Sequence, residues 1–131
     1  MKPQTGAFLE KAGELLDQAA TMLGVELPDA AGRTAYLAGL HAAQALIFER
    51  TGRIIKRHRG VRNELWRLTK DEPRFDPELR AFLGRAYSLK EIADYETGPG
   101  SHVSDELARA TVATARRFVD LITEFLDDAA P

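Results

Sequence analysis

Residues 29–51 read DAAGRTAYLAGLHAAQALIFERT. Apolar side chains recur in this stretch on more than one face of a helix, and a helix that is apolar on several faces is normally buried. Most of these side chains are small, so neighbouring helices can approach closely. We therefore expect a helix over residues 29–51, ended by Gly52, at the centre of a helical bundle.

Amphipathic helices are expected on both sides of this segment, because apolar residues recur there at spacings of three and four. Asp76 and Ser104 are typical N-caps, and Gly24 is a plausible helix end. The tail 127–131 should fray. The further helices are predicted over residues 7–23, 59–69, 77–95 and 105–126. The pattern indicates an all-α fold, an up-and-down bundle of four long helices plus one short helix, with residues 1–131 as one domain.

The composition excludes several classes of protein. The 131 residues contain no cysteine, so disulfides, thiolate chemistry and cysteine zinc sites are impossible. The N-terminal residues lack the apolar run of a signal peptide, and no stretch is long and apolar enough to span a membrane. We therefore expect a cytoplasmic protein without membrane association.

Charge is concentrated in one place. Residues 50–62 read RTGRIIKRHRGVR and contain six Lys or Arg, one His and no acid, whereas the other 118 residues carry 12 basic and 20 acidic groups. A cationic segment on an otherwise acidic chain suggests a specific anionic partner, such as RNA, a nucleotide or an acidic protein face. The alternative is a solvated basic loop between two helices. The candidate ligand-binding residues in this segment are Arg53, Lys56, Arg57, His58, Arg59 and Arg62.

The three histidines are candidate catalytic bases. His41 follows Arg33 by eight residues, about two helical turns, so both could share a face, with His41 moving a 2′-hydroxyl proton and Arg33 stabilising the phosphorane charge. The alternative is a packed histidine with one hydrogen bond. His58 begins the helix predicted at 59–69, where backbone N–H groups and guanidinium groups form a phosphate receptor and the adjacent Arg57 and Arg59 disfavour protonation. A metal site built on His41, His58 and His102 is not expected, and neither is a cofactor, because no metal-binding spacing or phosphate loop is present.

The end of the helix predicted at 77–95 holds three further candidate ligand-binding residues, Lys90, Asp94 and Tyr95. Lys90 lies one turn before Asp94, so the two could form a structural ion pair. Tyr95 could pack against Tyr36 in the bundle, or stack on a base. Trp66 has few apolar neighbours along the chain, which is typical of a residue at an interface.

Three motifs in this order resemble the prokaryotic HEPN domain family: RTAYLAGLHAAQAL at 33–46, RHRGV at 57–61 and LKEIADY at 89–95. The resemblance covers about residues 8–127. It implies an all-helical bundle that is commonly a homodimer, often paired as toxin and antitoxin with a minimal nucleotidyltransferase. Many members of the family are metal-independent ribonucleases, with an Arg followed four to six residues later by a His near the start of the last helix.

This chain departs from the nuclease motif of the family. Lys90 stands where the family usually has Arg, Asp94 and Tyr95 follow at the spacing of the missing His, and the nearest downstream His is His102. We therefore predict a binding module for RNA, a nucleotide or a nucleotidyltransferase partner. The alternative is a metal-independent endoribonuclease toxin that uses a His/Arg site. A third alternative is a structural dimer whose basic segment binds nothing.

Overall fold

The small-residue helix predicted at 29–51 lies at the centre of the bundle. The computed structural model describes residues 1–128. In it, helix α2 contacts each of the other four helices. The prediction of a central helix is therefore confirmed. The helices of the described residues are α1 (Pro3–Gly24), α2 (Pro28–Thr51), α3 (His58–Thr69), α4 (Pro77–Tyr95) and α5 (Asp105–Asp128).

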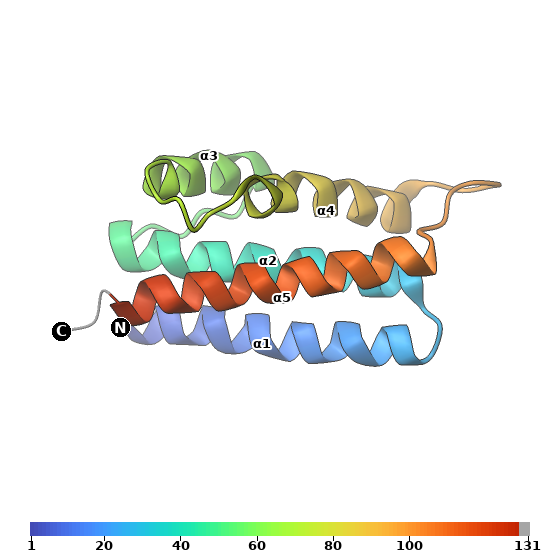
Figure 1. Ribbon diagram of the computed structural model, residues 1–131, viewed down its shortest axis with the longest axis horizontal. Helices are drawn as coiled ribbons and strands as arrows, with labels where there is room; N and C mark the ends of the chain where they lie inside the picture. Colours follow the sequence, from blue (N-terminus) through green and yellow to red (C-terminus); the bar gives the residue numbers. More distant parts are fainter. Residues whose placement is uncertain (129–131) are drawn as a thin grey trace.

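The four long helices alternate in direction, as the up-and-down prediction requires. Figure 1 shows α1 and α4 running one way along the long axis and α2 and α5 running back, while the short α3 lies beside the end of α2. Residues 1–128 contain no strand. The all-α bundle of four long helices and one short helix is thus confirmed.

Helix ends follow local signals that the sequence carries. Gly52 has φ 73°, the left-handed conformation that glycine adopts at little cost at a helix C-terminus. The side chain of Asp76 accepts a hydrogen bond from the Leu79 N–H at 2.9 Å, and Ser104 Oγ accepts one from the Leu107 N–H at 3.1 Å. Both predicted N-caps are confirmed, because each supplies an acceptor to a free N–H of the first turn.

Two helix limits differ from the prediction by more than one residue. Helix α1 starts at Pro3, four residues before the predicted start, because Glu49 of α2 accepts hydrogen bonds from the Lys2 N–H and the Thr5 hydroxyl, both at 2.8 Å. Helix α5 continues to Asp128, so the predicted fraying of Asp127 and Asp128 is wrong. Residues 129–131 of that predicted tail lie outside the described residues.

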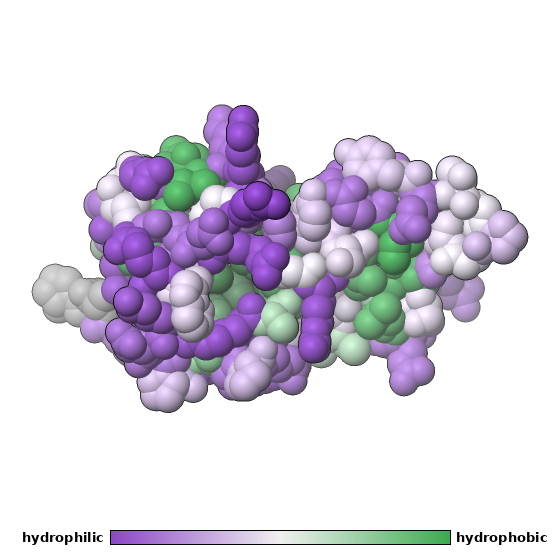
Figure 2. All heavy atoms as spheres, turned by 90° about the horizontal axis from the view of Figure 1, so that it is seen from above, coloured by the Kyte–Doolittle hydropathy of each residue, from purple (hydrophilic) through white to green (hydrophobic). Residues whose placement is uncertain are grey.

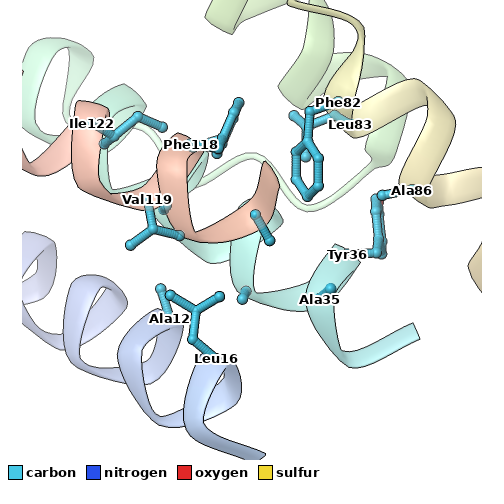
Figure 3. Packing of buried hydrophobic residues seen from close by; sticks show 14 of the residues in the cluster. Ala12, Leu16, Ala35, Tyr36, Phe82, Leu83, Ala86, Phe118, Val119 and Ile122 are labelled. Carbon is cyan, nitrogen blue, oxygen red and sulfur yellow. The ribbon is translucent and has the colours of Figure 1, made fainter. Parts of the chain in front are cut away.

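The core runs through the whole bundle and includes the place where α2, α4 and α5 meet. Figure 3 shows Phe82 of α4 pointing down beside Phe118 of α5, with Tyr36 of α2 pointing up towards Ala86 of α4. The Phe82 and Phe118 rings are 5.0 Å apart between centroids and both are buried. Gly39 of α2 faces the Phe82 ring, and a Cβ at position 39 would lie 2.3 Å from its Cε2 atom. The missing side chain therefore allows α4 to pack closely on α2.

Candidate functional site

A tyrosine–histidine cluster joins α2, α3 and α4. It consists of Tyr36, His58, Tyr87 and Glu91. The Tyr36 hydroxyl and His58 Nδ1 are hydrogen-bonded at 2.9 Å, and the His58 ring stacks on Tyr87 at 4.0 Å between centroids with 13° between the planes. Tyr36 also meets Tyr87 edge-on at 5.5 Å. His58, the first residue of α3, is therefore a packed residue that fixes the start of this helix against α2 and α4.

The surroundings of this cluster keep His58 neutral. Burial lowers the pKa of His58, and the charge of Arg62, one turn further along α3, lowers it again, while Glu91 acts in the opposite direction. The direction agrees with the sequence-based expectation, but the predicted cause, the adjacent Arg57 and Arg59, is wrong. Burial raises the pKa of Tyr36 to about 12, and the Glu91 carboxylate, one turn away, raises the pKa of Tyr87.

A carboxylate between two cations lies nearby on α2 and α4. Asp94 accepts from Arg33 Nε at 2.8 Å and from Lys90 Nζ at 2.7 Å. The hydrogen bond from Lys90, and to a smaller extent the one from Arg33, holds the pKa of Asp94 below its usual range. The ion pair predicted between Lys90 and Asp94 is thus confirmed. Tyr95 is 71% exposed, so the predicted packing of Tyr95 on Tyr36 is wrong. Tyr87, about two helical turns before Tyr95, packs on Tyr36 instead.

The other two histidines lie in structural settings. His41 stacks on Phe8 of α1 and its Nδ1 is hydrogen-bonded to Gln44 Oε1 at 2.8 Å, which confirms the packed-histidine interpretation. Arg33 points instead to α4, so the predicted shared face of Arg33 and His41 is wrong: eight residues leave the two side chains on different sides of α2. His102 is exposed, and its Nδ1 lies 2.8 Å from Asp29 Oδ2 at the start of α2.

The basic segment 50–62 has no counter-charges of its own. Within residues 1–128, none of its six Lys and Arg side chains has a carboxylate oxygen within 4.0 Å, whereas six of the other twelve cations of the chain form ion pairs. The cations of this segment are also exposed. Their charges are therefore available to an external anion.

A cavity of about 580 Å³ lies between α3 and α4 beside this segment, and we call it the α3 cleft. Figure 2 looks onto this side of the molecule, where hydrophilic side chains gather over the α3 half of the face and less polar ones show between them. Its floor is apolar and comes from α3, α4 and α5. The polar and aromatic residues of its wall are Arg59, Arg62, Asn63, Trp66 and Arg80.

The structure brings some of the predicted site residues together and separates others. Arg59, His58 and Arg62 share the start of α3, and Arg33, Lys90 and Asp94 form one ion-paired group. His41 and His102 contact neither group in the hydrogen bonds and ring contacts of the described residues.

Three residues of the site were missed from the sequence: Tyr87, Glu91 and Arg80. A signal existed for the first two, because Tyr87 lies four residues before Glu91 and seven before Asp94, on one face of α4. No such signal existed for Arg80, whose guanidinium stacks on Trp66 at 4.8 Å through a tertiary contact.

In the part of the chain that the structure describes, no three His, Asp or Glu side chains gather closely enough to hold a metal ion. None of the helices in that same part combines the length and the apolar character that a membrane span requires.

Comparison with known proteins gives two findings. A family model described as "HEPN domain" matches residues 5–125 of this chain. A "UPF0332 protein" of Archaeoglobus fulgidus is 32% identical over 111 residues, which cover 85% of this chain and 86% of that protein.

Proposed function

Because the chain belongs to the HEPN family, whose model matches nearly its whole length, we propose that it is an RNA-binding module. The observation that carries the proposal is the unpaired basic segment, residues 50–62. Six cations lie close together there without a carboxylate partner among the described residues, so they repel one another until an anion binds. A phosphate strand supplies negative charges at regular intervals along such a segment.

The rest of the protein directs the strand to this segment. Outside residues 50–62 the chain carries 12 basic and 20 acidic groups, so most of its surface repels a polyanion. At the start of α3, backbone N–H groups not used within the helix lie beside Arg57 and Arg59, which combines two kinds of phosphate donor. Arg53 and Lys56 extend the same charge into the loop before α3.

The test is fluorescence anisotropy with a labelled single-stranded RNA at several salt concentrations. The triple variant Arg57→Ala, Arg59→Ala, Arg62→Ala removes three phosphate contacts, so the slope of log K against log salt should fall by about 2, at roughly 0.7 per contact. All three residues are exposed, so circular dichroism should show unchanged helicity.

A matched control separates the segment from general electrostatics. The triple variant Lys11→Ala, Arg85→Ala, Arg116→Ala loses the same net charge from exposed positions on α1, α4 and α5. It should bind RNA nearly as the wild type does. Equal weakening in both triple variants, or unchanged binding in the first, would overturn the proposal.

A second candidate function is metal-independent RNA cleavage, and the setting of His58 favours it over the other two histidines. In the tautomer whose Nδ1–H donates to the Tyr36 hydroxyl, Nε2 keeps a lone pair that can take the proton of a 2′-hydroxyl. The lowered pKa of His58 keeps this base unprotonated at neutral pH. Arg62, one turn along α3, is placed to stabilise charge on the attacked phosphate.

Cleavage of RNA by purified protein in the presence of EDTA tests this second candidate. His58→Ala should abolish cleavage, whereas His41→Ala and His102→Ala should retain it. His58→Gln is included because it keeps a polar group near the Tyr36 hydroxyl. The absence of cleavage by the wild type, under conditions where a HEPN nuclease is active, would exclude the candidate and leave the binding module.

The homodimer, the minimal nucleotidyltransferase partner and the toxin–antitoxin pairing that the family resemblance implies stay predictions. So does the cytoplasmic location. The same triple variants test binding of a partner protein. A partner with an acidic face should bind the Arg57→Ala, Arg59→Ala, Arg62→Ala variant more weakly than the wild type, as RNA should.

A further inference from the structure

One polar face of α3 forms part of the wall of the α3 cleft. Arg59, Arg62, Asn63 and Trp66 recur at i, i+3, i+4 and i+7, which places them along one face of α3. It lies beside the buried face of α3, which holds Val61, Leu65 and Thr69. The polar face carries guanidinium groups, an amide and an indole beside a cavity of about 580 Å³.

Trp66 is held in place at the cleft, although it is exposed. Its side chain is 56% exposed, while the Arg80 guanidinium lies 4.8 Å from the ring centroid. Arg80 is itself anchored, because its Nη2 donates to the carbonyl oxygens of Thr69 at 2.7 Å and Glu72 at 3.2 Å. An aromatic ring that is already oriented loses little entropy when a flat group stacks on it.

Arg62 lies across the cleft against α4. A Cβ built on Gly84 would lie 3.2 Å from the Arg62 Cζ atom, so the absence of a side chain at Gly84 leaves the room that this guanidinium occupies. Neither Arg59 nor Arg62 has a carboxylate partner within the described part of the chain. Their N–H donors are therefore open towards the cavity and the solvent.

We propose that the α3 cleft takes one unpaired base of an RNA strand, stacked on Trp66, with the adjacent phosphate held by Arg59 and Arg62. Asn63 offers an amide donor and acceptor to the edge of the base. This inference rests on the proposed function and deepens it by naming the ligand class. A base in a duplex is stacked on its neighbours and cannot enter the cleft, so the ligand is a strand with unpaired bases.

The chain contains one tryptophan, so its own fluorescence reports on the contact. A short single-stranded RNA should quench the fluorescence of Trp66 on titration. An RNA duplex, inorganic polyphosphate and an abasic strand of the same length should leave it nearly unchanged, since none of them presents a free base. Equal quenching by the abasic strand and the RNA would overturn the stacking proposal.

Variants of Trp66 supply the second measurement, by anisotropy with the same labelled RNA. Trp66→Ala should weaken binding by about fivefold or more, the effect of removing one base–aromatic stack, and should bind RNA and the abasic strand alike. Trp66→Phe keeps a ring and should retain most of the affinity. Leu107→Ala removes an exposed apolar side chain from α5, away from the cleft, and should bind as the wild type does.

The outcomes separate this inference from the proposed function. If the wild type binds no RNA, the proposed function fails and the stack fails with it. If the wild type binds RNA in a salt-dependent manner but Trp66→Ala binds equally well, the basic segment stands as the site and the base stack is refuted. Preference for RNA over the abasic strand that disappears in Trp66→Ala supports both.

Discussion

Replacement of Gly39 by alanine tests the packing that brings α2 and α4 together. A Cβ at position 39 would lie 2.3 Å from Phe82 Cε2, 3.2 Å from Cζ and 3.3 Å from Cδ2. Carbon atoms normally approach to about 3.5–4.0 Å, so the nearest contact is more than about 1 Å too short. The Phe82 ring has little room to move, because it is buried against Phe118.

The magnitude follows from two opposing effects. Insertion of a methyl group into a packed core typically costs about 1–3 kcal/mol, and the large overlap places Gly39→Ala at the upper end. Alanine in place of glycine inside a helix stabilises the helix by about 1 kcal/mol, which offsets part of that cost. We therefore expect the free energy of unfolding to fall by about 2 kcal/mol, which lowers the Tm of a chain of this size by about 7 °C.

Urea denaturation followed by circular dichroism measures this change. Phe82→Leu removes the ring atoms that collide with the new methyl group, so the double variant Gly39→Ala, Phe82→Leu should be more stable than the sum of the single effects by about 1 kcal/mol or more. Gly13→Ala is the matched control, because a Cβ at position 13 of α1 meets nothing within 4 Å. A Gly39→Ala variant as stable as the wild type would refute the reasoning.

Two further predictions concern the ionisable groups of the site. Burial and the charge of Arg62 hold the folded-state pKa of His58 below its unfolded value of 6.5, so the folded protein takes up this proton less readily than the unfolded chain does. The stability that depends on neutral His58 should therefore be fully present above pH 6.5 and fall as the pH drops towards the lowered pKa; urea midpoints of His58→Gln should lack this change between about pH 7 and 5. Asp94→Asn leaves Arg33 and Lys90 without their carboxylate partner, so the free energy of unfolding should fall by about 1 kcal/mol in low salt and by less in 1 M salt, where exposed ion pairs are screened. An equal loss at both salt concentrations would contradict an electrostatic origin of the effect.

Much of the fold could be predicted because its signals are local. Apolar spacing of three and four located the helices, and Asp76, Ser104 and Gly52 marked helix ends through interactions within about four residues of the chain. The start of α1 was missed for the opposite reason. It depends on Glu49, which lies 47 residues away from Lys2 in the sequence.

The candidate site was predicted only in part. The sequence determined by itself that residues 50–62 are basic, that Lys90 can pair with Asp94, and that the helices of a bundle surround the segment 29–51. Only the tertiary structure decided that His58 stacks on Tyr87 and bonds to Tyr36, and that Arg80 holds Trp66 at a cleft. Side-chain partners on different helices depend on how those helices are rotated and spaced, and close packing at residues such as Gly39, rather than helical periodicity, sets that geometry.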